Sequence, residues 1–423
     1  MRILVTGANG QVGHELLRAL AGGGAAAANP HLAPRATLSQ GETEKTMNPS
    51  PVGKGAGVRV RNWEVIPATR SGQLEDGTPC ETIDLSDPGG LQAALGRIAP
   101  DLIINAGAYT AVDKAEDEPK LAQQVNAKAV RAIGVWAAQH GARVVHYSTD
   151  YVFDGTASAP YREDDVTHPV SAYGRSKLAG EIALCISGAR YLIFRTAWVY
   201  AARGKNFLRT MLRLGAERDE LRVVDDQVGV PTPAALIADV TVQAIARWYA
   251  EPDATSRQLD GLYHVVASGQ TSWCGFARAI FERAAPTGDG AEAHPSRSPA
   301  LRKEEPVKPA LARARRKRST ATAAKAAAPA VASAVHPLPQ EEGRRAAPAG
   351  CEAHAALLPH APRVIAITTA DYPTKAKRPA YSTLATTKLR DTFGIALPDW
   401  QTALDGVMDE LAAGLAVPAP KDT

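Results

Sequence analysis

A tyrosine and a lysine four residues apart form the strongest chemical signal in this 423-residue chain. Tyr173 and Lys177 open a predicted helix, and their spacing places both side chains on one helical face, one turn apart. A free tyrosine has a pKa of about 10 and exchanges protons poorly at neutral pH. A nearby ammonium favours the phenolate and should lower the pKa of Tyr173. The pair therefore predicts a general acid that protonates a carbonyl oxygen.

A strand-end hydroxyl supports the same chemistry. Ser148-Thr149-Asp150 follows a buried apolar run, and the Thr149 hydroxyl could bind the same carbonyl oxygen and hold it in line. Tyrosine and lysine occur at this spacing by chance on many helices. The catalytic hypothesis for Thr149, Tyr173 and Lys177 therefore depends on finding the other parts of a reductase in the expected order.

A glycine motif supplies one of those parts. Gly7, Gly10 and Gly13 follow a predicted strand and precede a predicted helix, with two residues between successive glycines. Gly7 permits a tight turn, Gly10 lets the backbone approach a pyrophosphate, and the helix N-terminus offers oriented N–H donors. We expect the dinucleotide contacts of this motif at Gly7, Asn9, Gly10, Gln11, Val12 and Gly13.

The end of the second predicted strand bears on which nicotinamide cofactor is used. An Asp or Glu there would bind the ribose 2′-hydroxyl of NAD, but this chain has Arg70. A cation suits a 2′-phosphate, so we expect NADPH, with NADH possible; an exposed arginine without a ligand is the alternative. Further cofactor contacts are expected at Asp84, Leu85, Ala106, Gly107, Ala108, Tyr173 and Lys177.

The elements that must position these residues alternate along the chain. Predicted strands at 2–6, 63–68, 102–105, 143–148 and 191–195 alternate with predicted helices that include 11–21, 121–140 and 172–184. This order is typical of an α/β fold, a Rossmann-like doubly wound parallel sheet with helices on both faces. We expect a cofactor domain over 1–200. Residues 201–423 should mainly form a smaller substrate-binding domain, with some segments returning to the first domain. The chain should become organised again from 363–367 onward and end in a helix near 400–415.

Two stretches interrupt the pattern. Residues 22–57 are rich in Gly, Ala, Pro and Ser, and residues 287–360 are biased to Ala, Pro and Arg, so both are predicted insertions. Residues 289–350 hold twelve Lys/Arg and six Asp/Glu; because the whole chain has a net charge of +4, the rest carries −2. This basic segment lacks interleaved aromatics, so we expect a solvated insertion, disordered or loosely helical, without nucleic acid as a partner.

Composition narrows the class of protein. With 45% hydrophobic residues and no apolar run long enough to span a bilayer, the chain should be a globular protein without a membrane partner. The first residues read as a buried strand rather than a signal peptide, so we expect a cytoplasmic location. The four cysteines show neither metal-ligand spacing nor a disulfide framework and should be reduced; they are Cys80, Cys185, Cys274 and Cys351.

Longer sequence strings resemble the extended short-chain dehydrogenase/reductases, and among them the dTDP-4-dehydrorhamnose reductase family. The similarity covers nearly the whole chain outside the two insertions. The strings that carry it are 7–13 (GANGQVG), 105–116 (NAGAYTAVDKAE), 148–155 (STDYVFDG), 173–181 (YGRSKLAGE), 194–200 (FRTAWVY), 226–232 (DQVGVPT), 264–269 (HVVASG) and Arg378-Pro379.

The resemblance implies a substrate and residues that bind it. The family's reaction reduces the C4 keto group of dTDP-4-dehydro-L-rhamnose with a hydride from NAD(P)H, giving dTDP-L-rhamnose. By resemblance, Lys177 also binds the nicotinamide ribose, and the sugar site includes Thr149, Tyr151, Tyr173 and Trp198. Asn206 and Arg378 are expected near the nucleotide diphosphate. Core packing is the alternative for Trp198.

The family's magnesium-linked homodimer is doubtful here. Two of its glutamate positions correspond to Glu15 and Glu410, but the third falls on Ala235, which removes a charge and a ligand oxygen from a hard-cation site. A homodimer remains possible.

Three other functions remain open. The chain could be another nucleotide-sugar reductase, an epimerase or a dehydratase of the same superfamily. It could be a non-catalytic homologue like the regulatory subunit of methionine adenosyltransferase. The basic insertion could also add nucleic-acid binding.

Overall fold

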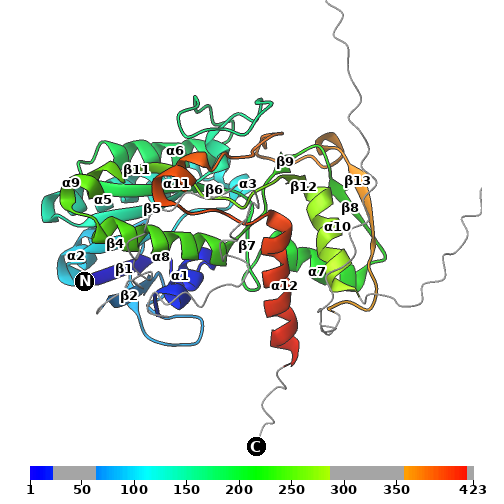
Figure 1. The fold of residues 1–423 in the computed structure, drawn as a ribbon, viewed down its shortest axis with the longest axis horizontal. Helices are drawn as coiled ribbons and strands as arrows, with labels where there is room; N and C mark the ends of the chain where they lie inside the picture. Colours follow the sequence, from blue (N-terminus) through cyan, green and yellow to red (C-terminus); the bar gives the residue numbers. More distant parts are fainter. Residues whose placement is uncertain (22–62, 286–356, 417–423) are drawn as a thin grey trace, which may run out of the picture. The chain divides into compact units, whose positions relative to one another are not determined.

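The computed structural model describes residues 1–21, 63–285 and 357–416 (Figure 1). The predicted insertion at 22–57, most of the one at 287–360, and Cys351 lie outside the described residues. Cys80, Cys185 and Cys274 are free thiols. Within the part of the chain that is described, no helix has both the length and the apolarity to cross a membrane.

A parallel sheet of seven strands forms the centre of the fold, which confirms the predicted Rossmann-like α/β class. Its order is β3-β2-β1-β4-β5-β6-β11. The direction of strand addition reverses between β1 and β4, and ligands of such sheets bind beyond the carboxyl ends of the strands at this switch point. The strands are β1 (Arg2–Thr6), β2 (Glu64–Thr69), β3 (Glu81–Thr82), β4 (Leu102–Asn105), β5 (Arg143–Thr149), β6 (Arg190–Thr196) and β11 (Gly261–His264).

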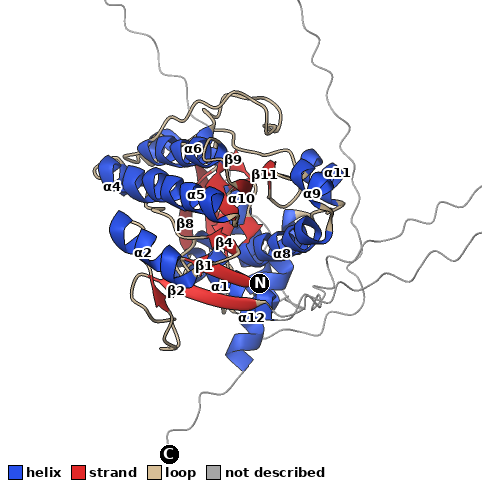
Figure 2. Cartoon of the chain, turned by 90° about the vertical axis from the view of Figure 1, so that its left-hand side faces the viewer, coloured by secondary structure: helices blue, strands red, loops and turns tan. Residues whose placement is uncertain are grey.

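Helices cover both faces of this sheet (Figure 2). One face carries α1 (Gln11–Ala21) and α8 (Ala234–Ala250); the other carries α2 (Pro88–Ile98), α5 (Ala129–His140) and α6 (Ala172–Cys185). The strand side chains divide between two cores: Ile3 and Val5 pack with α1 and α8, whereas Leu4 packs with α2 and α5. Burial on both faces explains why these strands read as continuous apolar runs.

The remaining elements lie mainly in the second half of the chain. Three two-stranded sheets pair β7 (Val199–Tyr200) with β10 (Thr232–Pro233), β9 (Val228–Gly229) with β12 (Thr271–Ser272), and β8 (Glu220–Val224) with β13 (Arg363–Ile367). The other helices are α3 (Val112–Ala115), α4 (Pro119–Gln123), α7 (Phe207–Glu217), α9 (Asp253–Gln258), α10 (Trp273–Ala284), α11 (Thr387–Phe393) and α12 (Trp400–Ala416). Helix α12 matches the helix predicted near 400–415, and β13 begins where the chain was expected to become organised again.

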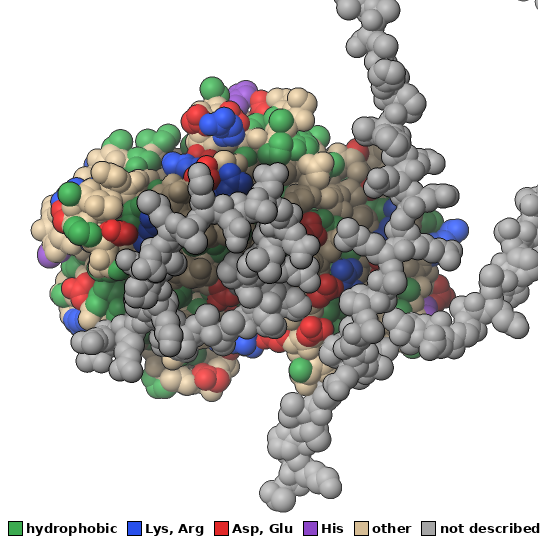
Figure 3. Space-filling view, in the orientation of Figure 1, with side chains coloured by type: hydrophobic (Ala, Val, Ile, Leu, Met, Phe, Trp, Pro, Cys, Tyr) green, Lys and Arg blue, Asp and Glu red, His purple; other side chains and the backbone are tan. Residues whose placement is uncertain are grey.

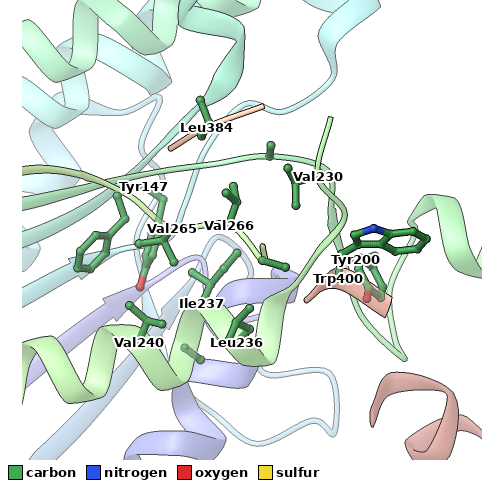
Figure 4. Packing of buried hydrophobic residues seen from close by; sticks show 14 of the residues in the cluster. Tyr147, Tyr200, Val230, Leu236, Ile237, Val240, Val265, Val266, Leu384 and Trp400 are labelled. Carbon is green, nitrogen blue, oxygen red and sulfur yellow. The ribbon is translucent and has the colours of Figure 1, made fainter. Parts of the chain in front are cut away.

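The larger core joins the central sheet to the second half of the chain. Figure 4 shows Ile237 and Val240 of α8 beside Val265 and Tyr147. The Tyr147 hydroxyl lies 2.9 Å from Thr241 Oγ1, so this buried phenol has a hydrogen-bond partner within α8. This hydrogen bond joins strand β5, which ends at the predicted catalytic residue Thr149, to helix α8.

The helix predicted at 121–140 is interrupted. A π-helical turn at Gln124–Lys128 separates α4 from α5. Its Asn126 side chain donates to Ser176 Oγ of α6 (2.9 Å), exchanges hydrogen bonds with the backbone of Tyr109, and is almost fully buried. Such turns often occur at functional sites. Apolar periodicity carries no signal for one extra residue in a turn, which is why the sequence predicted an uninterrupted helix.

The visible described surface has mixed charge. Figure 3 shows acidic and basic side chains interspersed over these residues. This agrees with the small net charge that remains once the basic segment at 289–350 is set aside.

The turn between β1 and α1 yields a stability prediction. A Cβ on Gly13 would lie 2.1 Å from the Gly7 carbonyl oxygen, a backbone atom that cannot yield easily. Gly13→Ala should therefore destabilise the fold by about 1–3 kcal/mol in urea unfolding. Gly96→Ala is the matched control, since its Cβ meets nothing within 4 Å in α2, and it should stabilise by about 0.5–1 kcal/mol. Equal stability of the two variants would contradict the packing described.

Candidate active site

The glycine motif forms a tight turn pressed against the neighbouring strand. Gly7 has a φ of +67°, and its carbonyl accepts from the Gly10 N–H at 2.8 Å. A Cβ on Gly7 would lie 2.6 Å from backbone atoms of Gly107, in the turn after β4. Only glycine permits both the left-handed conformation and this approach. The two turns that flank the switch point are thus in direct contact.

A cavity of about 480 Å³ opens beside this turn. Its wall includes Gly10, Gln11 and Val12 from the glycine motif, and Tyr173 and Lys177 from α6. The structure therefore brings the predicted cofactor motif and the predicted catalytic pair to one cavity. Further lining residues are Ala106, Gly107, Ala108, Ser148, Val199, Glu75, Arg203 and Lys205.

A second cavity, of about 540 Å³, lies on the other side of the glycine turn. Arg70, Asp84 and Leu85 line it. Both cavities share Gly7, Asn9, Gly10, Gly107 and Ala108. Every predicted cofactor residue except Gly13 lines one or both; Gly13 lies beneath the turn and allows its close packing. Two adjoining cavities across a helix N-terminus at the switch point are suited to a dinucleotide.

Close packing sets the position of helix α6. Ser171 caps its N-terminus by accepting from the Gly174 N–H at 3.1 Å. A Cβ on Gly174 would lie 2.2 Å from the Tyr151 carbonyl oxygen, and one on Gly180 would lie 2.0 Å from that of Asn126. Glycine at both positions lets the helix lie against the strand-end turn and the π-turn. Its first residues, with Tyr173 among them, are placed by these contacts.

Lys177 is a buried cation held by a strand end. Its Nζ donates to the Tyr147 carbonyl at 2.6 Å, and the side chain is almost fully buried. Burial lowers the pKa of Lys177 to about 8, while the charge of Glu181 opposes this shift. Glu181 itself forms a buried bidentate ion pair with Arg195 of β6, at 2.9 and 2.7 Å.

The pKa of Tyr173 differs from the sequence prediction. Lowering by the lysine was expected, but burial raises the pKa of Tyr173 to about 12, with a hydrogen bond from Thr149 opposing the shift. The prediction was wrong because burial would desolvate the phenolate, and the contact shown for the Lys177 ammonium is with the Tyr147 carbonyl. Tyr173 is therefore a neutral phenol across the physiological pH range, which is the form that can donate a proton.

The strand-end residues gather around Tyr173. Thr149 ends β5 and interacts with the Tyr173 hydroxyl, and the Tyr151 ring lies edge-on to Tyr173 with centroids 5.6 Å apart. Arg378, from the C-terminal part of the chain, interacts with the Tyr151 phenol and forms an ion pair with Asp113 (2.8 Å). Of the residues predicted to bind substrate, Thr149 and Tyr151 thus contact the predicted acid, and Arg378 contacts Tyr151.

The other two predicted substrate residues, like these three, are not among the residues that line either cavity. Trp198 has a φ of +47° and stacks on Trp273 with centroids 3.5 Å apart. Asn206 caps α7, and its amide donates to Gln11 Oε1 at 3.0 Å. Its neighbours Arg203 and Lys205 line the first cavity instead.

The positions of the family's metal-linked carboxylates are joined by an arginine. Arg18 Nη1 lies 2.9 Å from Glu15 Oε2 and 3.0 Å from Glu410 Oε1, connecting α1 to α12. Ala235 offers only a methyl group. One turn later on α8, burial raises the pKa of Asp239 to about 6. Among the described residues no cluster of three or more His, Cys, Asp or Glu side chains could hold a metal ion.

Several site residues were not foreseen from the sequence. Arg203 and Lys205 line the first cavity, Asp113 holds Arg378, and Asn126 holds α6. A basic pair in a loop and a single asparagine in a helix carry no distinctive spacing. Only the string at 105–116, which contains Asp113, pointed to this region.

Comparisons with known proteins agree on one family. A profile described as "RmlD substrate binding domain" matches residues 55–339 and 346–413. The dTDP-4-dehydrorhamnose reductase of Escherichia coli K12 is 39% identical over 334 residues, 79% of this chain and 87% of that protein. The Burkholderia thailandensis protein of the same name is 37% identical, covering 96% of this chain and 97% of its own length.

A solved structure extends the similarity to the fold. The dTDP-4-dehydrorhamnose reductase of Bacillus anthracis in complex with NADP is 26% identical, with a TM-score of 0.62, covering 97% of this chain and 99% of that one.

The buried lysine yields a prediction about stability and pH. Because the pKa of Lys177 is about 8 in the fold and about 10.5 in an unfolded chain, the unfolded state binds more protons between these values. Stability should therefore rise with pH in this window. Relative to Lys177→Met, wild type should gain about 1.4 kcal/mol per pH unit from pH 8 to 10 in denaturant titrations. A difference independent of pH would contradict the buried ammonium.

Proposed function

Because the chain belongs to the RmlD substrate-binding-domain family, we propose that it reduces the C4 keto group of dTDP-4-dehydro-L-rhamnose, giving dTDP-L-rhamnose. It is an NAD(P)H-dependent oxidoreductase of the extended short-chain dehydrogenase/reductase type. The observation that carries this proposal is that Tyr173 and Lys177 share a cavity with the glycine turn. Fold alone would not support an activity, because this architecture hosts many chemistries.

The two adjoining cavities fit a nicotinamide dinucleotide. The glycine turn would hold the pyrophosphate at the N-terminus of α1, where backbone N–H groups and the helix dipole favour an anion. Arg203 and Lys205 add positive charge to the same wall, and Lys177 would bind the nicotinamide ribose. When bound, the reduced nicotinamide supplies the hydride that is added to C4 of the sugar.

Tyr173 would supply the proton for the keto oxygen. Its raised pKa keeps the phenol neutral, and a neutral phenol is a stronger acid than the alcohol that forms at C4. Proton transfer to the developing alkoxide is therefore favourable. Thr149 would hydrogen-bond the same oxygen, which fixes the keto group relative to the phenol.

The substrate would be bound by segments from both halves of the chain. We assign residues 1–200 mainly to cofactor binding and residues 201–423 mainly to the substrate-binding domain. Arg378 would bind a phosphate of the dTDP group, and Tyr151 and Trp198 would contact the sugar. The Asn206 amide is committed to the cap of α7 and to Gln11, so we propose that it acts by holding the glycine turn.

Two finer points concern the cofactor and the metal. We propose NADPH as the preferred reductant because Arg70 lies in the second cavity with the hydroxyls of Thr69 and Ser71, a polar set suited to a 2′-phosphate. The Glu15, Glu410 and Ala235 positions do not fit Mg²⁺, because Arg18 is already paired with both carboxylates and the third position has no oxygen.

The rival functions have less support. The two relatives compared above, both at least 37% identical, bear the name of the reductase, not of an epimerase or a regulatory subunit. The catalytic set Thr149, Tyr173 and Lys177 is retained in one cluster, as an enzyme requires. The basic segment that could bind nucleic acid lies outside the described residues.

Removing the phenol tests the proposed acid. Tyr173→Phe should lower kcat by a factor of about 10²–10⁴, because the keto oxygen loses its proton donor. NADPH binding, followed by fluorescence titration, should be retained. The control is Tyr372→Phe, since Tyr372 is an exposed tyrosine and its variant should keep wild-type kcat. A Tyr173→Phe enzyme with wild-type kcat would remove Tyr173 from the mechanism.

Arg70 tests the cofactor preference. Arg70→Ala should lower the ratio of kcat/KM for NADPH to that for NADH by about 10- to 100-fold, because a charge-assisted contact with the 2′-phosphate is lost. Arg213→Ala, which removes an exposed arginine paired with Glu217 on α7, should leave the ratio unchanged. An unchanged ratio in Arg70→Ala would contradict the proposed phosphate contact.

A further inference from the structure

Asp150 is a buried carboxyl next to the proposed catalytic hydroxyl. It is 1% exposed and stands between Thr149 and Tyr151 in the chain. Its Oδ1 lies 2.8 Å from Thr149 Oγ1, whereas its Oδ2 is buried without a hydrogen-bond partner among the described residues. The proposed mechanism gives this carboxyl no role, although it touches one of the three catalytic side chains.

The Thr149 hydroxyl has one proton to donate, and the protonation state of Asp150 determines which acceptor receives it. If the carboxyl is ionised, it can only accept, and Thr149 donates to it. Thr149 Oγ1 also accepts from the Tyr151 N–H at 3.2 Å. Its remaining lone pair would then face the Tyr173 phenol. In this state Thr149 cannot donate to a keto oxygen.

If Asp150 is neutral, donor and acceptor exchange roles in the 2.8 Å hydrogen bond between Asp150 and Thr149. A carboxylic acid has one O–H donor, which can bind Thr149 Oγ1. Thr149 then accepts from both Asp150 and the Tyr151 N–H, and its own proton is free for the substrate. Two hydroxyls, those of Thr149 and Tyr173, could then donate to the same oxygen, an arrangement that stabilises negative charge developing there.

The surroundings of Asp150 favour the neutral form. A buried carboxylate loses its hydration, and the Oδ2 atom of Asp150 has no hydrogen-bond partner among the described residues to replace it. The ionisable groups that respond to its charge are the phenols of Tyr151 and Tyr173. The cation that contacts Tyr151, Arg378, is paired with Asp113. Burial raises the pKa of Asp150 to about 6, although interactions with Ser382, with Thr149 and with the backbone of Asp150 and Tyr151 favour the carboxylate.

We propose that Asp150 is a positioning residue that works as a neutral acid: it donates to Thr149 Oγ1 so that the Thr149 hydroxyl donates to the keto oxygen beside Tyr173. Asp150 keeps its proton through the reaction, so the stoichiometry of hydride and proton addition is unchanged. This inference rests on the proposed reductase function, and it adds a fourth residue to the catalytic cluster.

Single-turnover kinetics at saturating NADPH and keto sugar test this proposal between pH 5.5 and 8. The wild-type rate should fall about tenfold as Asp150 ionises, because the donor lost to the keto oxygen is worth about 1.4 kcal/mol. Asp150→Asn carries an amide that donates to Thr149 at every pH, so its rate should stay level within about twofold. Asp164→Asn removes an exposed carboxyl and should keep the wild-type profile.

Two further variants separate positioning from a general structural effect. Thr149→Val should be slow and independent of pH, since it lacks the hydroxyl that Asp150 orients. The double variant Thr149→Val/Asp150→Asn should be no slower than Thr149→Val. A loss of more than about a hundredfold in correctly folded Asp150→Asn at pH 5.5, or a decline in that variant equal to the wild-type decline, would overturn the proposal.

An infrared measurement makes the test independent of turnover. The difference spectrum of wild type minus Asp150→Asn, each with NADP⁺ and dTDP at pH 5.5, should contain the C=O stretch of a carboxylic acid. Carboxylate bands in its place would overturn the inference. Failure of the proposed function would be seen separately, as a wild-type enzyme that reduces no keto sugar at any pH.

Discussion

The hydrogen bond from the Lys177 ammonium to the Tyr147 carbonyl ties the active-site helix to the carboxyl end of the central sheet. A buried ammonium is unfavourable unless its donors are satisfied, so α6 has little freedom to shift along β5. Glu181, one turn later on the same helix, pairs with Arg195 of β6 and compensates the charge. Because Tyr173 lies at the start of α6, these contacts also fix its position relative to the sheet. The position of the proposed acid therefore depends on the hydrogen bond between Lys177 and the Tyr147 carbonyl.

The second constraint is the contact between the turns after β1 and β4. Gly7 and Gly107 approach so closely that neither turn can move without the other. The cavities on either side share this wall, and the residues expected to hold the two halves of the cofactor are therefore positioned by one backbone contact. The proposed catalytic pair and the glycine turn come from different parts of the chain, and the parallel sheet places both at the same edge.

The sequence was most informative where chemistry and local geometry coincide. The glycine turn and the Tyr173/Lys177 pair each combine a residue type with a short spacing, and both were foreseen, as was the alternation of strands and helices. The direction of the Tyr173 pKa shift was not, because it depends on how deeply the phenol is buried and on where Lys177 directs its protons. The π-turn at Asn126 and the basic pair Arg203 and Lys205 depend on packing between distant segments, for which a single sequence holds no periodic signal.

Transfer of a labelled hydride tests the central claim most directly. With NADPH that carries deuterium in the transferable C4 position and dTDP-4-dehydro-L-rhamnose, the enzyme should oxidise one NADPH for each sugar reduced. The product should carry the deuterium at sugar C4 by NMR. An enzyme that changes the sugar without net oxidation of NADPH, or that forms product with no deuterium at C4, would contradict the reductase described here.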